Sequence, residues 1–150
     1  MNENQSQNNY ATISKINNFI YLGSFEHPLF RSEEFEKLGI DVIINCSKEV
    51  EYTEQDKYII ESYPIIDGES LSMLEYMDKI NDSITHHLSE GKKIYLHCVN
   101  GISRSPAVLI YYFMTHKNFS YNSALELLKS IRPVIDIDHE FENLLKTIDD

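Results

Sequence analysis

A run of nine apolar residues at positions 106–114, PAVLIYYFM, constrains the fold of this chain more than any other feature. A helix with apolar side chains all around it must be buried on every side. The run is about half as long as the ~20 residues that a membrane-spanning helix needs. We therefore expect a central helix that the rest of the chain surrounds, and no transmembrane segment.

Two kinds of pattern flank this helix. Short apolar runs predict strands, and longer stretches with apolar residues on one face predict helices. The predicted strands are 19–22, 40–45, 58–66 and 94–97, and the predicted helices are 29–38, 70–88, 107–114, 120–132 and 141–148. Strands that alternate with helices favour an α/β fold, in which helices flank a mostly parallel sheet.

Length and charge narrow the class of protein further. The 150 residues are enough for one domain, which we expect at 10–150, after a polar and disordered tail at 1–9. Thirteen Lys and Arg against 24 Asp and Glu give a net charge of −11, which disfavours nucleic-acid and membrane partners. The chain shows no secretory leader, and two cysteines cannot form a disulfide framework. We expect a monomer in the cytosol or the nucleus.

The segment 94–106, IYLHCVNGISRSP, predicts a buried strand, a short loop and the start of the buried helix. In open α/β sheets, ligands bind beyond the carboxyl ends of the strands, where a helix N-terminus attracts anions. Gly101 can adopt a positive φ in this loop, and Pro106 suits a first helical turn. A phosphate cradle is therefore predicted at Val99, Asn100, Gly101, Ile102, Ser103 and Arg104.

Cys98 lies at the floor of this predicted cradle. The loop amides, the helix N-terminus and Arg104 would all stabilise its thiolate, which makes Cys98 the candidate nucleophile. The planar fork of Arg104 can hold two phosphoryl oxygens at once. Expelling an alkoxide or phenoxide requires an acid, for which Asp67 is the best candidate and Glu69 the competitor. Ser105 could donate a hydrogen bond to the sulfur when it becomes a leaving group.

The motif His97-Cys98-x-x-Gly101-x-Ser103-Arg104-Ser105 resembles the phosphate-binding loop of the cysteine-dependent protein tyrosine phosphatase superfamily, specifically its dual-specificity subgroup. The segments INNFIYLG, LGIDVIIN, YPIID and SIRPVI resemble that family's segments in the same order, so the resemblance spans 13–148. It departs after residue 135, where the family usually has Pro-Asn and this chain has Ile137-Asp138.

The resemblance implies a five-stranded central sheet and a small, atypical member of the subgroup, without a docking domain for MAP kinases. It implies hydrolysis of phosphotyrosine and phosphoserine/threonine in proteins through a phosphocysteine, with no metal or other cofactor. Among the residues, it implies Cys98 as nucleophile, Arg104 as phosphate clamp, Asp67 as general acid and Ser105 as helper of phosphoenzyme hydrolysis. His97 matches the histidine that orders the family's loop.

Other functions remain as alternatives. A phosphatase of lipids or RNA ends usually benefits from basic loop residues, and Arg104 is the loop's single cation. A phospho-residue binding module would be expected to have lost Cys98, Arg104 or Asp67. A sulfurtransferase or an arsenate reductase also uses a cysteine loop, but the Arg-Ser-Pro helix start and Asp67 fit phosphoryl transfer better.

Two further groups of residues are expected to be structural. Cys46 could form a reversible disulfide with Cys98, but a buried core thiol is the commoner outcome. No zinc-site spacing is present among four of the other histidines, so we predict no metal site and a solvated surface position for them. These are His86, His87, His116 and His139.

Overall fold

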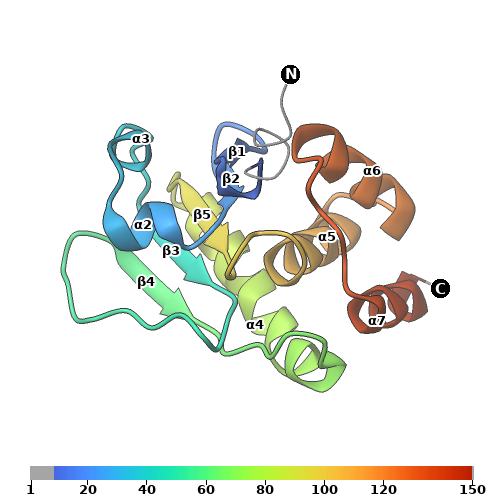
Figure 1. The fold of residues 1–150 in the computed structure, drawn as a ribbon. Coiled ribbons are helices and arrows are strands. Elements are labelled where there is room, and N and C mark those ends of the chain that lie inside the picture. The colour runs from blue at the N-terminus through green and yellow to red at the C-terminus, as the bar shows by residue number, and fades with distance from the viewer. Residues whose placement is uncertain (1–8, 150) are drawn as a thin grey trace.

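The computed structural model describes residues 9–149 and contains a five-stranded sheet (Figure 1). The strands lie in the order β1-β2-β5-β3-β4. Their bounds are β1 Ser14–Lys15, β2 Ile20–Gly23, β3 Val42–Asn45, β4 Ile59–Ser62 and β5 Ile94–His97. The last four of that order run parallel, and β1 pairs antiparallel with β2. The predicted, mostly parallel sheet is thus confirmed.

Helices cover both faces of this sheet (Figure 1). The larger layer packs on the strand residues that include Ile94 and Leu96, and the smaller layer packs on the opposite face around Tyr95. The larger layer holds α4 Ser70–Ser89, α5 Arg104–His116, α6 Tyr121–Ile131 and α7 His139–Asp149. Nine residues of α5 are buried, so the predicted central helix is confirmed.

The smaller layer corrects one prediction. Instead of a single helix at 29–38, the chain forms α2 Glu26–Phe30 and α3 Glu33–Glu36. Arg31 adopts a left-handed conformation with a φ of 49°, which ends α2. Ser32 then caps α3, since its side chain accepts the N–H of Phe35 at 3.1 Å. A serine inside an apolar pattern here marks the start of a second helix.

The predicted strand at 58–66 is also too long, because β4 ends at Ser62. Pro64 has no N–H to contribute to a ladder, and the N–H of Ile65 turns back to the carbonyl of Tyr63 at 2.7 Å. The chain therefore leaves the sheet before Asp67 and crosses to the start of α4.

The described part of the chain begins with a short helical turn before β1. Most of the predicted tail, residues 1–8, lies outside the described residues, and Asn9 begins a short 3-10 helix, η1 Asn9–Ala11. Within residues 9–149, no helix is both long and apolar enough to cross a bilayer.

Candidate active site

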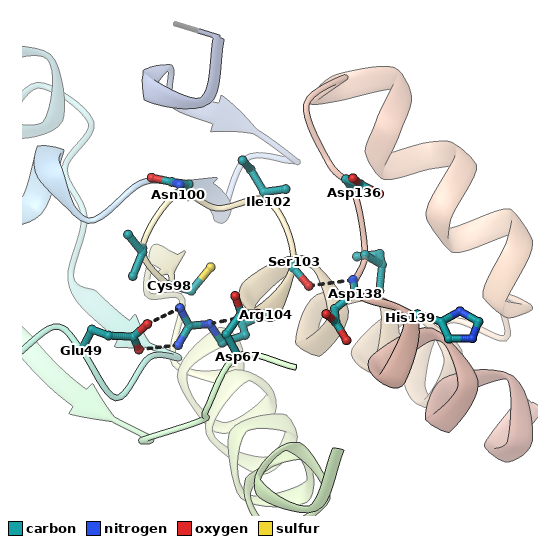
Figure 2. Close-up of a pocket in the computed structure, with 12 residues that line it drawn as sticks. Glu49, Asp67, Cys98, Asn100, Ile102, Ser103, Arg104, Asp136, Asp138 and His139 are labelled. Atoms are coloured by element: carbon teal, nitrogen blue, oxygen red, sulfur yellow. Dashed lines mark hydrogen bonds and ion pairs between the residues drawn. The ribbon is translucent and has the colours of Figure 1, made fainter. Parts of the chain in front are cut away.

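A loop at residues 98–103 joins β5 to α5 at the carboxyl edge of the sheet, where Figure 2 shows it curving around the sulfur of Cys98. Gly101 in this loop has a φ of +69°, a conformation that favours glycine. A Cβ at this position would lie 2.5 Å from the carbonyl oxygen of Gly23. The predicted need for glycine in the loop therefore has two causes, backbone conformation and close contact with β2.

The carbonyl groups of this loop are all held by hydrogen bonds. From residue 98 to residue 103 in order, their donors are His97 Nδ1, the N–H of Phe25, Arg132 Nη2, Arg132 Nε, the N–H of Asp136 and the N–H of Ala107. Because the C=O and N–H of a trans peptide point in opposite directions, the N–H groups face away from these donors. Within the described chain, the N–H groups of residues 99–103 donate no hydrogen bond. The loop thus offers a row of donors to an anion, and phosphate binding by this loop stays a prediction.

His97 supports the loop from the interior of the protein. Its Nδ1 lies 2.7 Å from the carbonyl oxygen of Cys98, and its Nε2 lies 2.8 Å from the hydroxyl of Tyr52. A carbonyl can only accept, so Nδ1 carries the proton and Nε2 accepts from Tyr52. Burial lowers the pKa of His97 to about 4, which keeps the ring neutral near pH 7. Tyr52 was not predicted from the sequence, because no local pattern links it to residue 97.

Cys98 and Ser105 lie together at the base of the pocket. The cysteine side chain is buried, and its Sγ is 3.3 Å from the Oγ of Ser105 in the first turn of α5. A hydroxyl at this distance can donate a hydrogen bond to a thiolate. The position of Ser105 is therefore compatible with the role predicted for it.

Arg104 is held in place by two other segments. Its Nη1 and Nη2 donate to the two carboxylate oxygens of Glu49 at 2.6 and 3.0 Å (Figure 2). Nη1 also donates to the carbonyl of Ile65 at 2.9 Å. Burial alone would lower the pKa of Arg104, but the hydrogen bond to Glu49 and the nearby negative charges raise it overall. The guanidinium therefore stays charged although its side chain is only 5% exposed.

Glu49 is a second site residue that the sequence did not reveal. The hydrogen bond from Arg104 lowers the pKa of Glu49, so this carboxylate is ionised near neutral pH. It follows β3, in a stretch without a recognisable motif. Its bidentate contact fixes the plane of the guanidinium, which the motif around Cys98 could not predict.

Asp67 reaches the pocket from the turn before α4. Its Oδ1 is 3.9 Å from Nε of Arg104, and its side chain is 61% exposed. Asp67, Cys98 and Arg104 all line one cavity of about 620 Å³. Glu69, the competing candidate, is the N-cap residue of α4 and is not among the residues that line this cavity. The geometry thus favours Asp67 over Glu69.

Two more carboxylates line the same cavity. Asp136 and Asp138 belong to the segment between α6 and α7, which passes beside the loop (Figure 2). The N–H of Asp138 donates to Oγ of Ser103 at 2.9 Å. Ser103 is the N-cap residue of α5 and makes no capping hydrogen bond with its side chain. Asp138 belongs to the Ile137-Asp138 pair at which the chain departs from the family's usual Pro-Asn, and no function was predicted for either carboxylate.

Arg132 is the third residue that the sequence analysis did not assign to the site. It is the C-cap residue of α6 and lies within the segment SIRPVI. Its side chain is 1% exposed and donates to the carbonyls of Asn100 and Gly101 at 2.8 Å each. The same guanidinium donates to the carbonyls of Tyr10 and Thr12. Arg132 therefore joins the phosphate-binding loop to the N-terminal segment.

The second cysteine, Cys46, is part of the hydrophobic core. Cys46 is fully buried just after β3, and its N–H donates to the carbonyl of His97 at 2.7 Å. Burial raises the pKa of the Cys46 thiol well above its usual value. Both cysteines are free thiols. The prediction of a core thiol is confirmed, and the redox alternative stays untested.

One histidine prediction is wrong. His87 is buried rather than solvated, and its Nε2 lies 2.8 Å from Oε2 of Glu61. Within the described residues, one group of three potential metal ligands lies together, namely His86, His87 and Glu90. Glu90 already pairs with Lys92 at 2.8 Å, and the group lies near the C-terminal end of α4. The ring centroids of His86 and His87 lie 5.2 Å apart.

The chain is similar in sequence to known proteins. The family described as dual specificity phosphatase, catalytic domain, matches residues 20–149. Protein phosphatase Slingshot of Drosophila melanogaster is 33% identical over 89% of this chain, and the match covers 13% of that protein. Dual specificity protein phosphatase 1 of Mus musculus is 28% identical over 85% of this chain and 34% of its own length. The chain thus spans about a third or less of these relatives.

Solved structures show the same fold. The crystal structure of DUSP15 has a TM-score of 0.83 at 21% identity, over 91% of this chain and 86% of that one. The crystal structure of human DUSP28 has a TM-score of 0.80 at 21% identity, over 91% of this chain and 92% of that one.

Proposed function

Because the chain belongs to the family of dual-specificity phosphatase catalytic domains, we propose that it hydrolyses phosphotyrosine and phosphoserine/threonine in proteins through a phosphocysteine intermediate. The observation that carries this proposal is the orientation of the loop. Its six carbonyls are turned outward to donors, which leaves a row of amide N–H groups around Cys98 and Arg104. Such a cradle stabilises the negative charge that spreads over the phosphoryl oxygens in the transition state.

In the first step, the Cys98 thiolate attacks phosphorus, so that an S–P bond forms while the bond to the substrate oxygen breaks. The guanidinium of Arg104 and the loop amides hold the equatorial oxygens. Asp67 gives its proton to the departing oxygen, which leaves as an alcohol or a phenol.

In the second step, water attacks phosphorus, inorganic phosphate leaves, and the thiolate is regenerated. Deprotonated Asp67 can now accept a proton from this water. Ser105, at 3.3 Å from the sulfur, supports the departing thiolate by donating a hydrogen bond. Every group in this scheme comes from one chain, so we propose that a monomer suffices for activity.

The alternatives are less well supported by the site. The loop carries no cation except Arg104, and four carboxylates line the cavity, so a lipid headgroup or RNA end with several phosphates would meet repulsion. A binding module needs no acid beside the loop. Here Asp67 lies within 3.9 Å of Arg104, which supports turnover.

The proposal is tested with phosphotyrosine and phosphoserine peptides in the presence of EDTA. We expect phosphate release from both, because none of the proposed steps uses a metal. Cys98→Ser should release no phosphate and still bind the phosphotyrosine peptide, because a serine hydroxyl is a poor nucleophile while the cradle and Arg104 remain. Turnover by Cys98→Ser within about tenfold of the wild type would remove Cys98 from its role, and loss of wild-type activity on chelation would contradict the mechanism.

A further inference from the structure

Two carboxylates at the mouth of the cavity have no part in the proposed reaction. Asp136 and Asp138 line the cavity from the segment between α6 and α7. Their backbone is fastened to the phosphate-binding loop, because the N–H of Asp136 donates to the carbonyl of Ile102 at 3.0 Å and the N–H of Asp138 donates to Oγ of Ser103 at 2.9 Å. Any residue that flanks a bound phosphoryl group on this side must therefore pass close to two fixed acidic positions.

The other two carboxylates of the cavity lie beside Arg104. Glu49 is paired with Arg104, and Asp67 lies beside the same guanidinium. Asp136 and Asp138 make no ion pair with any residue that the structure describes. One oxygen of Asp138 accepts the N–H of Glu140 at the start of α7, and this bond does not neutralise the carboxylate. Figure 2 shows both residues across the pocket from Glu49.

The carboxylates of this cavity oppose the binding of an anionic substrate. Four carboxylates, one guanidinium and the imidazole of His139 line the cavity, and the reaction adds a thiolate and a phosphate dianion. The loop amides and Arg104 compensate the charge at the phosphate itself, but Arg104 is paired with Glu49, across the pocket from Asp136 (Figure 2). A substrate that brings its own positive charge to the 136–138 side would offset the remaining repulsion.

We propose that Asp136 and Asp138 select phosphoprotein segments that carry Lys or Arg next to the phosphorylated residue. The inference rests on the proposed function and names the substrate class of the same site. Arg and Lys flanks would pair with the two carboxylates, whereas acidic or additionally phosphorylated flanks would be repelled by them.

The test uses three phosphotyrosine peptides that differ only in the residues on either side of the phosphorylated one, which are Lys, Gln or Glu. For the wild type, we expect kcat/KM to decrease in that order, with at least about a fivefold difference between the Lys and Gln peptides. The preference should shrink in 1 M salt, because the Debye length falls to about 3 Å. Equal kcat/KM values for the three peptides would overturn the inference.

Variants of Asp136 and Asp138 test whether these two carboxylates cause the preference for Lys-flanked peptides. The double variant Asp136→Asn/Asp138→Asn should bring the Lys-to-Gln ratio close to one, and Asn at residue 138 can still cap α7. Asp138→Lys should favour the Glu peptide. The control Glu75→Gln/Glu126→Gln makes the same change in net charge at positions of α4 and α6 outside the cavity, and should keep the wild-type ratio. A double variant with the wild-type ratio, or a control that loses it, would exclude these carboxylates as the cause.

Binding of the same peptides to Cys98→Ser separates this inference from the proposed function. If the wild type releases no phosphate, the proposed function fails, while tighter binding of the Lys peptide than of the Gln peptide to Cys98→Ser would still support the selecting role of Asp136 and Asp138. If all three peptides bind equally and are hydrolysed equally, the phosphatase activity stands and the selection fails.

Discussion

Asp67 has the most exposed side chain among the residues proposed to take part in the reaction, and it reaches the cavity from a turn rather than from the sheet. Its role depends on the leaving group. An alkoxide needs a proton to depart, whereas the anion of an activated phenol does not. Glu69, two residues away, serves as a matched control because it lies outside the cavity.

We therefore predict that Asp67→Asn lowers kcat/KM for a phosphoserine peptide by about 100-fold or more and for p-nitrophenyl phosphate by much less. Glu69→Gln should change neither value appreciably. The measurement is steady-state hydrolysis of both substrates by the two variants. Should Glu69→Gln produce the dependence on the leaving group instead, the acid has been assigned to the wrong residue.

At the scale of elements, the loop between β5 and α5 depends on Gly101 for its path. Alanine at 101 would need a positive φ and would place a Cβ 2.5 Å from the carbonyl oxygen of Gly23. Gly91, after α4, has a similar φ of +75°, but a Cβ added there would meet no neighbouring heavy atom within 4 Å. Alanine at residue 91 would meet only the penalty of a positive φ, whereas alanine at residue 101 would also clash with the backbone of Gly23.

Gly91→Ala should lower the free energy of unfolding by about 1 kcal/mol and leave kcat/KM unchanged, because only the backbone conformation is disfavoured. Gly101→Ala should destabilise the protein further and lower kcat/KM by at least about 100-fold, since the amide donors move out of register with the phosphoryl oxygens. Urea unfolding and steady-state kinetics on both variants test this. An active Gly101→Ala protein would show that the loop tolerates a different path.

The elements that the sequence predicted well are those with a local signal. The apolar pattern of α5, the strand before it and the motif from His97 to Ser105 are contiguous, so their arrangement in space follows from the chain itself. Glu49, Tyr52 and Arg132 come from separate segments that meet the loop only because β5 lies between β2 and β3 and because α6 packs beside α5. No pattern within one segment contains that information, and the two-residue β1 is too short to leave a pattern at all.

For the whole molecule, the buried His97 couples stability to pH. In the folded protein its pKa is lowered to about 4, from 6.5 in an exposed setting, because burial disfavours the charged ring. Between these two pH values the unfolded chain binds a proton that the folded protein does not bind. The stability contributed by neutral His97 is thus fully present above about pH 6.5 and is lost progressively as the pH falls toward 4.

We predict that the free energy of unfolding falls by about 3 kcal/mol between pH 6.5 and pH 4 on account of this one residue. Urea unfolding of the wild type and of His97→Asn at several pH values measures the difference, which should be smaller in the variant. An NMR titration of the His97 ring provides a second measurement that does not depend on the variant folding. A ring that titrates near 6.5 in the folded protein would contradict the prediction.

Arg132 has a consequence for where this chain can be shortened. Its guanidinium takes three of its five acceptors from Tyr10, Thr12 and Ser14, and the other two from Asn100 and Gly101. A fragment that starts at residue 9 keeps all of them. A fragment that starts at residue 16 removes three acceptors of the buried Arg132 guanidinium, which is destabilising. Because the same guanidinium holds the carbonyls of Asn100 and Gly101, the loop at 98–103 should be destabilised as well. Residues 10–14, which are remote from Cys98 in sequence, therefore belong to the shortest fragment that keeps all the acceptors of Arg132.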